Sequence, residues 1–139
     1  MKPKFISAHM QVAETYAQLS SATRLKVGAI IVKDNRIISI GYNGTPSGWD
    51  NVCEYEDKDE QLITKSEVLH AESNALMKLA RTTGDAEDAV VFITHAPCLE
   101  CAKLIYQSGI AEVYYKDVYR SEEGIKFLLE ANVHVRKVL

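Results

Sequence analysis

Residues 89–108 read Ala-Val-Val-Phe-Ile-Thr-His-Ala-Pro-Cys-Leu-Glu-Cys-Ala-Lys-Leu-Ile-Tyr-Gln-Ser and indicate how the whole chain folds. Residues 89–94 are a short apolar run of the kind that forms a buried strand, and residues 98–108 have a helical pattern. Pro97 suits the start of that helix, because the N–H that proline lacks would have no partner there. A strand that leads directly into a helix is the unit from which α/β proteins are built.

Further strands and helices are expected on both sides of this unit. Residues 27–32 and 36–42 are β-rich runs around a polar turn at 33–35, which predicts an antiparallel hairpin. The first run is almost wholly apolar, so we expect it to lie centrally in its sheet. Residues 51–66 are polar and carry only weak structural signals. Helices are predicted at residues 4–20, 66–81, 98–108 and 121–130, and later strands at 112–116 and 133–138.

The order of these elements predicts the architecture. Strands that alternate with helices after the hairpin favour parallel pairing, with helices on both faces of the sheet. We therefore expect one domain over residues 1–139, an α/β fold in which a central mixed sheet of about five strands forms a three-layer α/β/α sandwich. Helical spacing predicts the inward-facing side chains, namely Phe5, His9, Val12, Tyr16 and Leu19 in the first helix and Leu69, Ser73, Leu76, Met77 and Ala80 in the second.

The composition narrows the classes of partner. The formal net charge is −3, whereas proteins that grip long nucleic acids usually carry a basic excess. A small anionic substrate is therefore favoured over a polymeric nucleic acid. No apolar run approaches the roughly 20 residues that span a bilayer, and the N-terminus lacks a signal-peptide pattern, so no membrane partner is expected. Three cysteines, two of them in C-x-x-C spacing, predict no disulfide scaffold and a reducing, cytoplasmic setting.

Two short motifs carry the chemistry, His70-Ala71-Glu72 and the pair Cys98 and Cys101. One imidazole and two thiols are good zinc ligands, and a catalytic zinc keeps a fourth position open for water or substrate. Cysteines at i and i+3 share a helix face, and the helix N-terminus favours the thiolate that zinc binds. Glu72 lies beside the ligands and is free to move protons. We expect a catalytic zinc, which lowers the pKa of bound water to about 7.

This combination resembles the zinc-dependent cytidine deaminase-like superfamily, whose signature is H-x-E followed by P-C-x-x-C. Residues 41–48, Gly-Tyr-Asn-Gly-Thr-Pro-Ser-Gly, together with Lys-Val-Gly-Ala-Ile-Ile at residues 26–31, further resemble the deoxycytidylate (dCMP) deaminase family. The resemblance extends from the first helix to about residue 119. It implies hydrolysis of dCMP to dUMP and ammonia, which supplies dUMP for thymidylate synthesis. Glu72 would then be the catalytic proton carrier.

The same resemblance implies contacts with the substrate. Asn43 is expected to bind the deoxyribose, and the backbone around Ala71 and from Thr94 to Ala96 is expected to read the edge of the cytosine. His95 is either a shield for the base or a partly buried spectator. Cations and hydroxyls bind phosphate, so the candidates for the 5′-phosphate are Arg24, Lys26 and Tyr119.

Members of the family are typically hexameric and regulated. The resemblance therefore implies a homo-oligomer, a hexamer, with dCTP as an activator, dTTP as an inhibitor and Mg²⁺ bound with the effector nucleotide. The effector site is expected between subunits, around the glycine-rich loop at residues 42–50. Its candidate residues are Tyr42, Gly44, Thr45, Asp50, Lys78 and Arg81.

Other interpretations of the motifs stay open. A tRNA adenosine deaminase shares H-A-E and P-C-x-x-C, but it resembles a sequence with D-P-T-A before H-A-E, and Glu67-Val68-Leu69 stand there in this chain. A riboflavin-pathway deaminase would not require the loop at residues 41–48, and a nucleoside cytidine deaminase usually has cysteine in place of His70. A non-catalytic zinc module would need a fourth protein ligand, for which Glu72 is the candidate. Cys53 is expected to be a small buried residue, and a second zinc is not expected.

Overall fold

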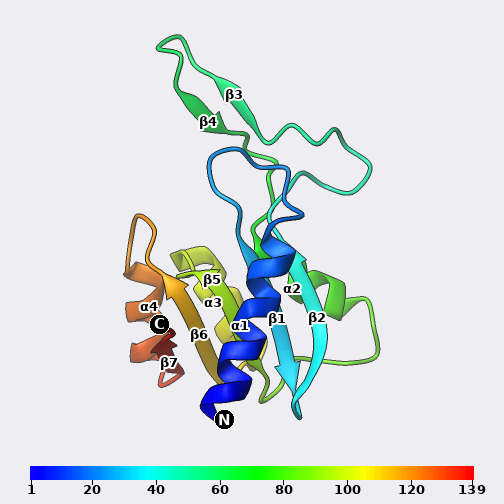
Figure 1. The fold of residues 1–139 in the computed structure, drawn as a ribbon, viewed down its shortest axis with the longest axis vertical. Helices are drawn as coiled ribbons and strands as arrows, with labels where there is room; N and C mark the ends of the chain where they lie inside the picture. The colour runs from blue at the N-terminus through cyan, green and yellow to red at the C-terminus, as the bar shows by residue number, and fades with distance from the viewer.

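The computed structural model describes residues 1–139 and contains a five-stranded sheet with strand order β2-β1-β5-β6-β7 and a separate two-stranded sheet, β3-β4. Figure 1 shows the small sheet projecting beyond one end of the main sheet. The helices are α1 (Pro3–Ala17), α2 (Ala71–Ala80), α3 (Leu99–Gln107) and α4 (Glu123–Glu130). The strands are β1 (Gly28–Lys33), β2 (Arg36–Tyr42), β3 (Glu54–Glu56), β4 (Leu62–Thr64), β5 (Val90–His95), β6 (Glu112–Asp117) and β7 (His134–Lys137). None of the helices is long and apolar enough to cross a membrane.

The main sheet is mixed, as predicted. β1 pairs antiparallel with β2 and with β5, whereas β6 is parallel to both β5 and β7. β1 is buried along nearly its whole length and lies inside the sheet, which confirms the prediction for the apolar run. Asp34 and Asn35 both have positive φ, 52° and 59°, which is the geometry of a tight hairpin turn. The carboxyl ends of β5 and β6 meet at one edge, where His95 pairs with Asp117.

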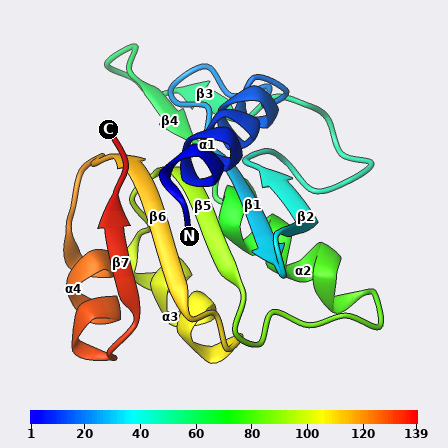
Figure 2. The same ribbon diagram turned by 60° about the horizontal axis from the view of Figure 1, so that its bottom comes forward.

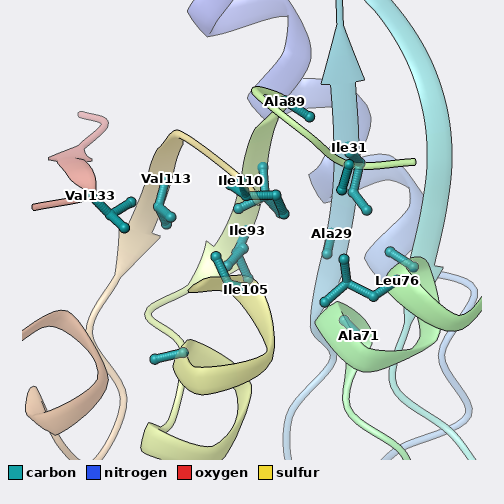
Figure 3. Close-up of a cluster of buried hydrophobic side chains, with 14 of the residues drawn as sticks. Ala29, Ile31, Ala71, Leu76, Ala89, Ile93, Ile105, Ile110, Val113 and Val133 are labelled. Carbon is teal, nitrogen blue, oxygen red and sulfur yellow. The ribbon is translucent and has the colours of Figure 1, made fainter. Parts of the chain in front are cut away.

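Helices cover both faces of the sheet, and α1 lies across one of them (Figure 2). Successive residues of a strand point to opposite faces. Ile30 therefore packs with Met10 and Ala13 of α1, while Ile31 belongs to the larger cluster on the other face. That larger cluster lies between the sheet and the helices α2, α3 and α4 (Figure 3). The predicted three-layer α/β/α architecture is confirmed.

The buried face of α1 matches the predicted one only in part, with His9 buried and Phe5, Val12 and Tyr16 half-buried. Leu19, predicted to face inward, is 59% exposed and lies beyond the end of the helix. Gly28 of β1 explains the difference, because a Cβ at this position would stand 2.1 Å from the carbonyl oxygen of Ala13. Helix and strand approach so closely that small side chains are selected between them, and apolar spacing alone does not reveal this. The buried residues of α1 are His9, Met10, Ala13 and Ala17.

α2 is shorter than predicted. Gly44 and Leu69 form an isolated antiparallel bridge in which each N–H donates to the other's carbonyl, at 3.1 and 2.8 Å. The chain is therefore extended just before the helix, which begins at Ala71 and not near residue 66. The buried face is Ala71, Glu72, Ala75, Leu76 and Leu79. Of the side chains predicted to face inward, Leu76 is buried and Ser73 half-buried, but Leu69, Met77 and Ala80 are exposed.

The contact between β2 and α2 fixes the start of this helix. A Cβ added at Gly41 would stand 2.2 Å from the carbonyl oxygen of Ala71 and 2.6 Å from the backbone nitrogen of Ala75. Backbone atoms cannot move aside as the end of a flexible side chain can. We expect Gly41→Ala to lower the free energy of unfolding by about 2–3 kcal/mol, the usual cost of overpacking a core.

Urea denaturation measures this loss, and zinc content reports whether the start of α2 has shifted. Gly44→Ala is the matched control, because a Cβ at Gly44 meets nothing within 4 Å. Equal stability of the two variants would contradict the expected overpacking.

Residues 51–66 form a defined element, although only weak structure was predicted there. β3 and β4 pair antiparallel, with Glu54 opposite Thr64 and Tyr55 opposite Ile63. The turn is held by the Asp57 carboxylate, which accepts hydrogen bonds from the backbone nitrogens of Asp59 and Gln61. The strands are three residues long and lie outside the main sheet, so neither length nor apolar periodicity marked them.

Candidate active site

Three predicted metal ligands come together at the N-termini of α2 and α3. His70 is the residue before α2, Cys98 is the N-cap of α3, and Cys101 lies in its first turn. The prediction that His70 lies within a helix is therefore wrong: His70 is the N-cap, one residue before the helix. The Gly44–Leu69 bridge keeps the preceding chain extended, so the helix begins later than predicted. His70 Nδ1 is 3.3 Å from Cys101 Sγ and 3.5 Å from Cys98 Sγ, and all three ligand atoms lie within 4.8 Å of one another.

These distances match a tetrahedral zinc site. Bond lengths of about 2.3 Å to sulfur and about 2.0–2.1 Å to nitrogen place tetrahedral nitrogen and sulfur ligands about 3.6 Å apart. The chemistry of the donor set fits as well, because one imidazole and two thiols leave one coordination position for a non-protein ligand. Glu72 is not among the clustered ligand atoms.

The contacts among the ligands favour a thiolate. Hydrogen bonds from Cys101 and His70 lower the pKa of the Cys98 thiol to about 4. The contact with Cys98 and burial raise the pKa of the Cys101 thiol, and the contact with Cys98 raises the pKa of His70. The cluster thus carries one thiolate at neutral pH, and a thiolate is the form of cysteine that binds zinc.

Glu72 is the buried acid beside this cluster. It lies in the first turn of α2, and its side chain is directed into the protein, leaving the residue 5% exposed. Burial, which disfavours the charged form, raises the pKa of this carboxyl to about 7. A group whose pKa is near the working pH can both accept and return a proton, which is what general acid–base catalysis requires.

A cavity of about 330 Å³ is lined by two of the three predicted metal ligands, His70 and Cys98. Its lining includes His70, Glu72 and Cys98 near one part of the wall, and Arg24 and Tyr119 from two other segments of the chain. Its lining also includes the predicted substrate residues Asn43 and Ala71. Lys26 and Thr94, which were predicted with them, do not line the cavity, but Ala96, the other end of the predicted backbone segment, does.

The family described as "Cytidine and deoxycytidylate deaminase zinc-binding region" matches residues 3–117. The chain belongs to this family. It is 36% identical to deoxycytidylate deaminase of Saccharomyces cerevisiae over 99% of its own length, but it spans only 46% of that relative. It is 32% identical to deoxycytidylate deaminase of Enterobacteria phage T4, with 81% of this chain and 78% of that protein covered.

A solved structure agrees with the family assignment. The crystal structure of dCMP deaminase from the cyanophage S-TIM5, in complex with dCMP and dUMP, superposes with a TM-score of 0.93. The two chains are 44% identical, and 99% of each is covered. The resemblance drawn from the motifs is therefore confirmed, and this chain is a deaminase with a cytidine deaminase-like fold.

Two predicted substrate residues of the deaminase are tied to its own backbone. Asn43 Oδ1 accepts from the backbone nitrogen of Val27 at 2.8 Å, and Asn43 Nδ2 donates to the carbonyl of Leu25 at 2.8 Å. One Nδ2 hydrogen is left for a substrate. Thr94 Oγ1 accepts from Gly28 N at 3.1 Å and is buried, so its side chain joins β5 to the start of β1. These two residues hold the cavity wall in place.

His95 does line the cavity of the deaminase. Its Nδ1 lies 2.9 Å from Thr94 Oγ1, and its ring meets the ring of Tyr119 edge to face with 6.5 Å between centroids. Burial lowers the pKa of His95, so its imidazole is predominantly neutral at pH 7. A neutral ring can pack against a base without adding charge beside the metal ligands.

Near the predicted Arg24 and Tyr119, the cavity lining contains residues that the sequence did not single out, namely Thr64, Glu54 and Arg120. Arg24 Nη1 donates to Thr64 Oγ1 at 3.1 Å, and Arg24 Nη2 lies 3.5 Å from the Tyr119 hydroxyl. Arg120 stacks on the Tyr119 ring, 5.2 Å from its centroid. Arg120 could have been found from its place after the carboxyl end of a strand. Thr64 and Glu54, which also line the cavity, belong to the hairpin that was not predicted.

The predicted effector residues lie outside this cavity. Lys78 Nζ is 5.3 Å from the centre of the Tyr42 ring, so the loop and α2 are in contact. Gly44 pairs with Leu69, the Thr45 hydroxyl donates to the carbonyl of Asp50, and Arg81 caps the end of α2.

Proposed function

We propose that the deaminase hydrolyses dCMP to dUMP and ammonia. The observation that carries the proposal is the composition of a single cavity. Its lining includes the His70, Cys98 and Glu72 side chains and also Arg24, Tyr119 and Arg120. The first set suits removal of an amino group from a cytosine ring, and the second suits a 5′-phosphate. The deoxycytidylate deaminases of yeast and phage T4 support the same substrate.

The protein's own residues have distinct tasks in this reaction. Zinc, when bound by His70, Cys98 and Cys101, supplies a water that is acidic enough to lose a proton near pH 7. Glu72 receives that proton and delivers it to the cytosine ring nitrogen. Overall, water adds oxygen at C4, the C4–N bond breaks, and the amino group leaves as ammonia. Glu72 can act in both directions because burial has brought its pKa to about 7.

The phosphate contacts decide between a nucleotide and a nucleoside. Arg24 and Arg120 are cations, and the hydroxyls of Thr64 and Tyr119 are additional donors at the same end of the cavity. A hydrogen bond between charged groups contributes about 1.5–3 kcal/mol. Lys26 is exposed and does not line the cavity, so Arg24 is the better-supported of the two predicted basic residues.

An ammonia-release assay on dCMP, CMP, deoxycytidine and a tRNA anticodon stem tests the proposal. We expect kcat/KM on dCMP to exceed that on deoxycytidine by about 10²–10⁴-fold, because two phosphate contacts of this strength are lost with the nucleoside. No activity on the tRNA stem is expected. Equal activity on dCMP and deoxycytidine would refute the phosphate site and leave a nucleoside deaminase.

We further propose regulation through the loop at residues 42–50 in a homo-oligomer, a hexamer, with dCTP activating, dTTP inhibiting and Mg²⁺ accompanying the effector. The contact between Lys78 and Tyr42 supports coupling, because it joins this loop to the helix that carries Glu72. Trp49 and Met77, 58% and 55% exposed, are apolar side chains that a subunit interface would cover. Three free cysteines suit a reducing compartment such as the cytoplasm. The same assay with dCTP or dTTP added tests the regulation, and identical rates would contradict it.

A further inference from the structure

Glu54 is a buried acid that takes no part in the proton transfers described above. It begins β3, lines the cavity and is only 9% exposed. A single oxygen of its carboxylate, Oε2, accepts two backbone hydrogen bonds, from Thr23 N at 2.8 Å and from Arg24 N at 2.9 Å. Hydrogen bonds to an ionised acceptor are about twice as strong as neutral ones, so this contact restrains the backbone that carries Arg24.

The other end of Arg24 is held by the same hairpin. Its guanidinium donates to Thr64 Oγ1 at 3.1 Å, and Thr64 is the cross-strand partner of Glu54 in the pairing of β3 with β4. One pair of facing residues thus contacts both the backbone and the side chain of Arg24. The segment between α1 and β1 has no regular secondary structure, so these contacts supply restraint that a helix or strand would otherwise give.

We propose that Glu54 is a positioning residue that, together with Thr64, holds Arg24 in place for the phosphate of the nucleotide. This inference rests on the proposed function, because it assumes that an anion occupies the Arg24 end of the cavity. Two consequences follow for substitutions. A neutral acceptor of the same shape keeps Arg24 in place, and loss of the acceptor releases it.

Two substitutions of Glu54 distinguish a positioning role from an electrostatic role. A carboxylate in the wall of an anion site repels a phosphate, so an electrostatic role would make removal of the charge favourable in every variant. A positioning role requires the acceptor atom, and a neutral acceptor should fill it with weaker hydrogen bonds than a carboxylate does. Glu54→Gln and Glu54→Ala both remove the charge, but only glutamine retains a side-chain oxygen that can accept from Thr23 and Arg24.

The test measures kcat and KM on dCMP and on deoxycytidine for the zinc-loaded enzyme. For Glu54→Ala we expect KM on dCMP to rise about tenfold while kcat stays within about twofold, the pattern of lost substrate binding. Activity on deoxycytidine, which has no phosphate, should change less than about twofold. Glu54→Gln should restore KM on dCMP to within about threefold of the wild-type value. Glu56→Ala, an exposed residue of the same strand, is the matched control and should match the wild type.

The outcomes are distinct. If the wild type prefers dCMP and Glu54→Ala keeps that preference in full, the positioning role is overturned while the proposed function stands. A parallel loss on both substrates would show general structural damage and would also overturn it. Equal wild-type activity on both substrates would refute the phosphate site itself. If Glu54→Ala does not fold, Thr64→Val decides, because it removes only the Nη1 contact; an unchanged KM on dCMP in that variant overturns the inference.

Discussion

Replacing Glu72 by glutamine is expected to lower kcat on dCMP by about 10³-fold or more while zinc stays bound, since a positioned acid–base group contributes about 10²–10⁴-fold. Glutamine has nearly the same shape and can form hydrogen bonds, but it cannot take a proton from water and pass it on. The side chain is 5% exposed, so bulk water cannot easily replace it. Rapid-quench or ammonia-release kinetics measures kcat, and atomic absorption measures zinc per chain.

Glu100→Gln is the matched control for this substitution. Glu100 lies between the two ligand cysteines, but its side chain is 80% exposed and pairs with Lys103 at 3.1 Å. It should retain wild-type activity. Loss of zinc together with folding in Glu72→Gln would contradict the catalytic role and favour a site in which Glu72 is the fourth ligand of a structural metal. Retained zinc with full activity would show that another group carries the proton.

The sequence was sufficient for the architecture and for the ligand set, and there are physical reasons for both. An apolar run such as residues 27–32 is favourable only where both faces of the strand are buried. This predicted a position inside the sheet, where β1 is found. Cys98 and Cys101 were predicted to point at one metal from the start of a helix; Cys98 is the N-cap and not a helical residue, but both sulfurs lie within 3.5 Å of His70 Nδ1. His70 meets the two cysteines because it immediately precedes α2, although the sequence placed it inside that helix.

The sequence was insufficient where close approach or distant partners decide the structure. Apolar spacing predicted the larger side chains of α1 to face the sheet, but Gly28 brings the strand so close that Ala13 and Ala17 are selected there. The hydrogen-bonding capacity of Asn43 suggested a sugar contact, yet two backbone groups already use one donor and one acceptor position of its amide. The environment of Arg24 depends on a hairpin about 30 residues away, which no local pattern indicated.

Removal of zinc is expected to abolish deamination and to lower the melting temperature by about 10 °C, because a metal that binds only the folded protein stabilises it. Treatment with a chelator followed by thermal denaturation measures the loss, and addition of zinc should restore both properties. Addition of Mg²⁺ is the control, since a magnesium ion prefers oxygen ligands and should not restore activity. Activity that survives removal of all measurable zinc would contradict the metal site.

The zinc-free protein should also reveal the cost of burying Glu72. Its carboxyl has a pKa of about 7 in the folded state against an ordinary value near 4.5, so the folded state binds more protons than the unfolded chain between these values. Stability from Glu72 is therefore present below about pH 4.5 and is lost as the pH rises through about 7, by about 3 kcal/mol in total. The Cys98 thiol has the opposite effect, because its lowered pKa adds stability as the pH rises from about 4.

The pH effects of Glu72 and Cys98 on stability cancel in part. The contribution of Glu72 is therefore measured by comparing the zinc-free wild type with zinc-free Glu72→Gln. Urea denaturation between about pH 5 and about pH 8 should show the wild type losing stability relative to the variant as the pH rises. Glutamine has no proton to release, so the difference between the two proteins contains the titration of Glu72 together with the effect of its charge on the pKa of His70 and Cys101. If the difference in stability between the two proteins does not depend on pH, burial does not raise the pKa of Glu72. A near-neutral pKa of the proton carrier would then need another cause.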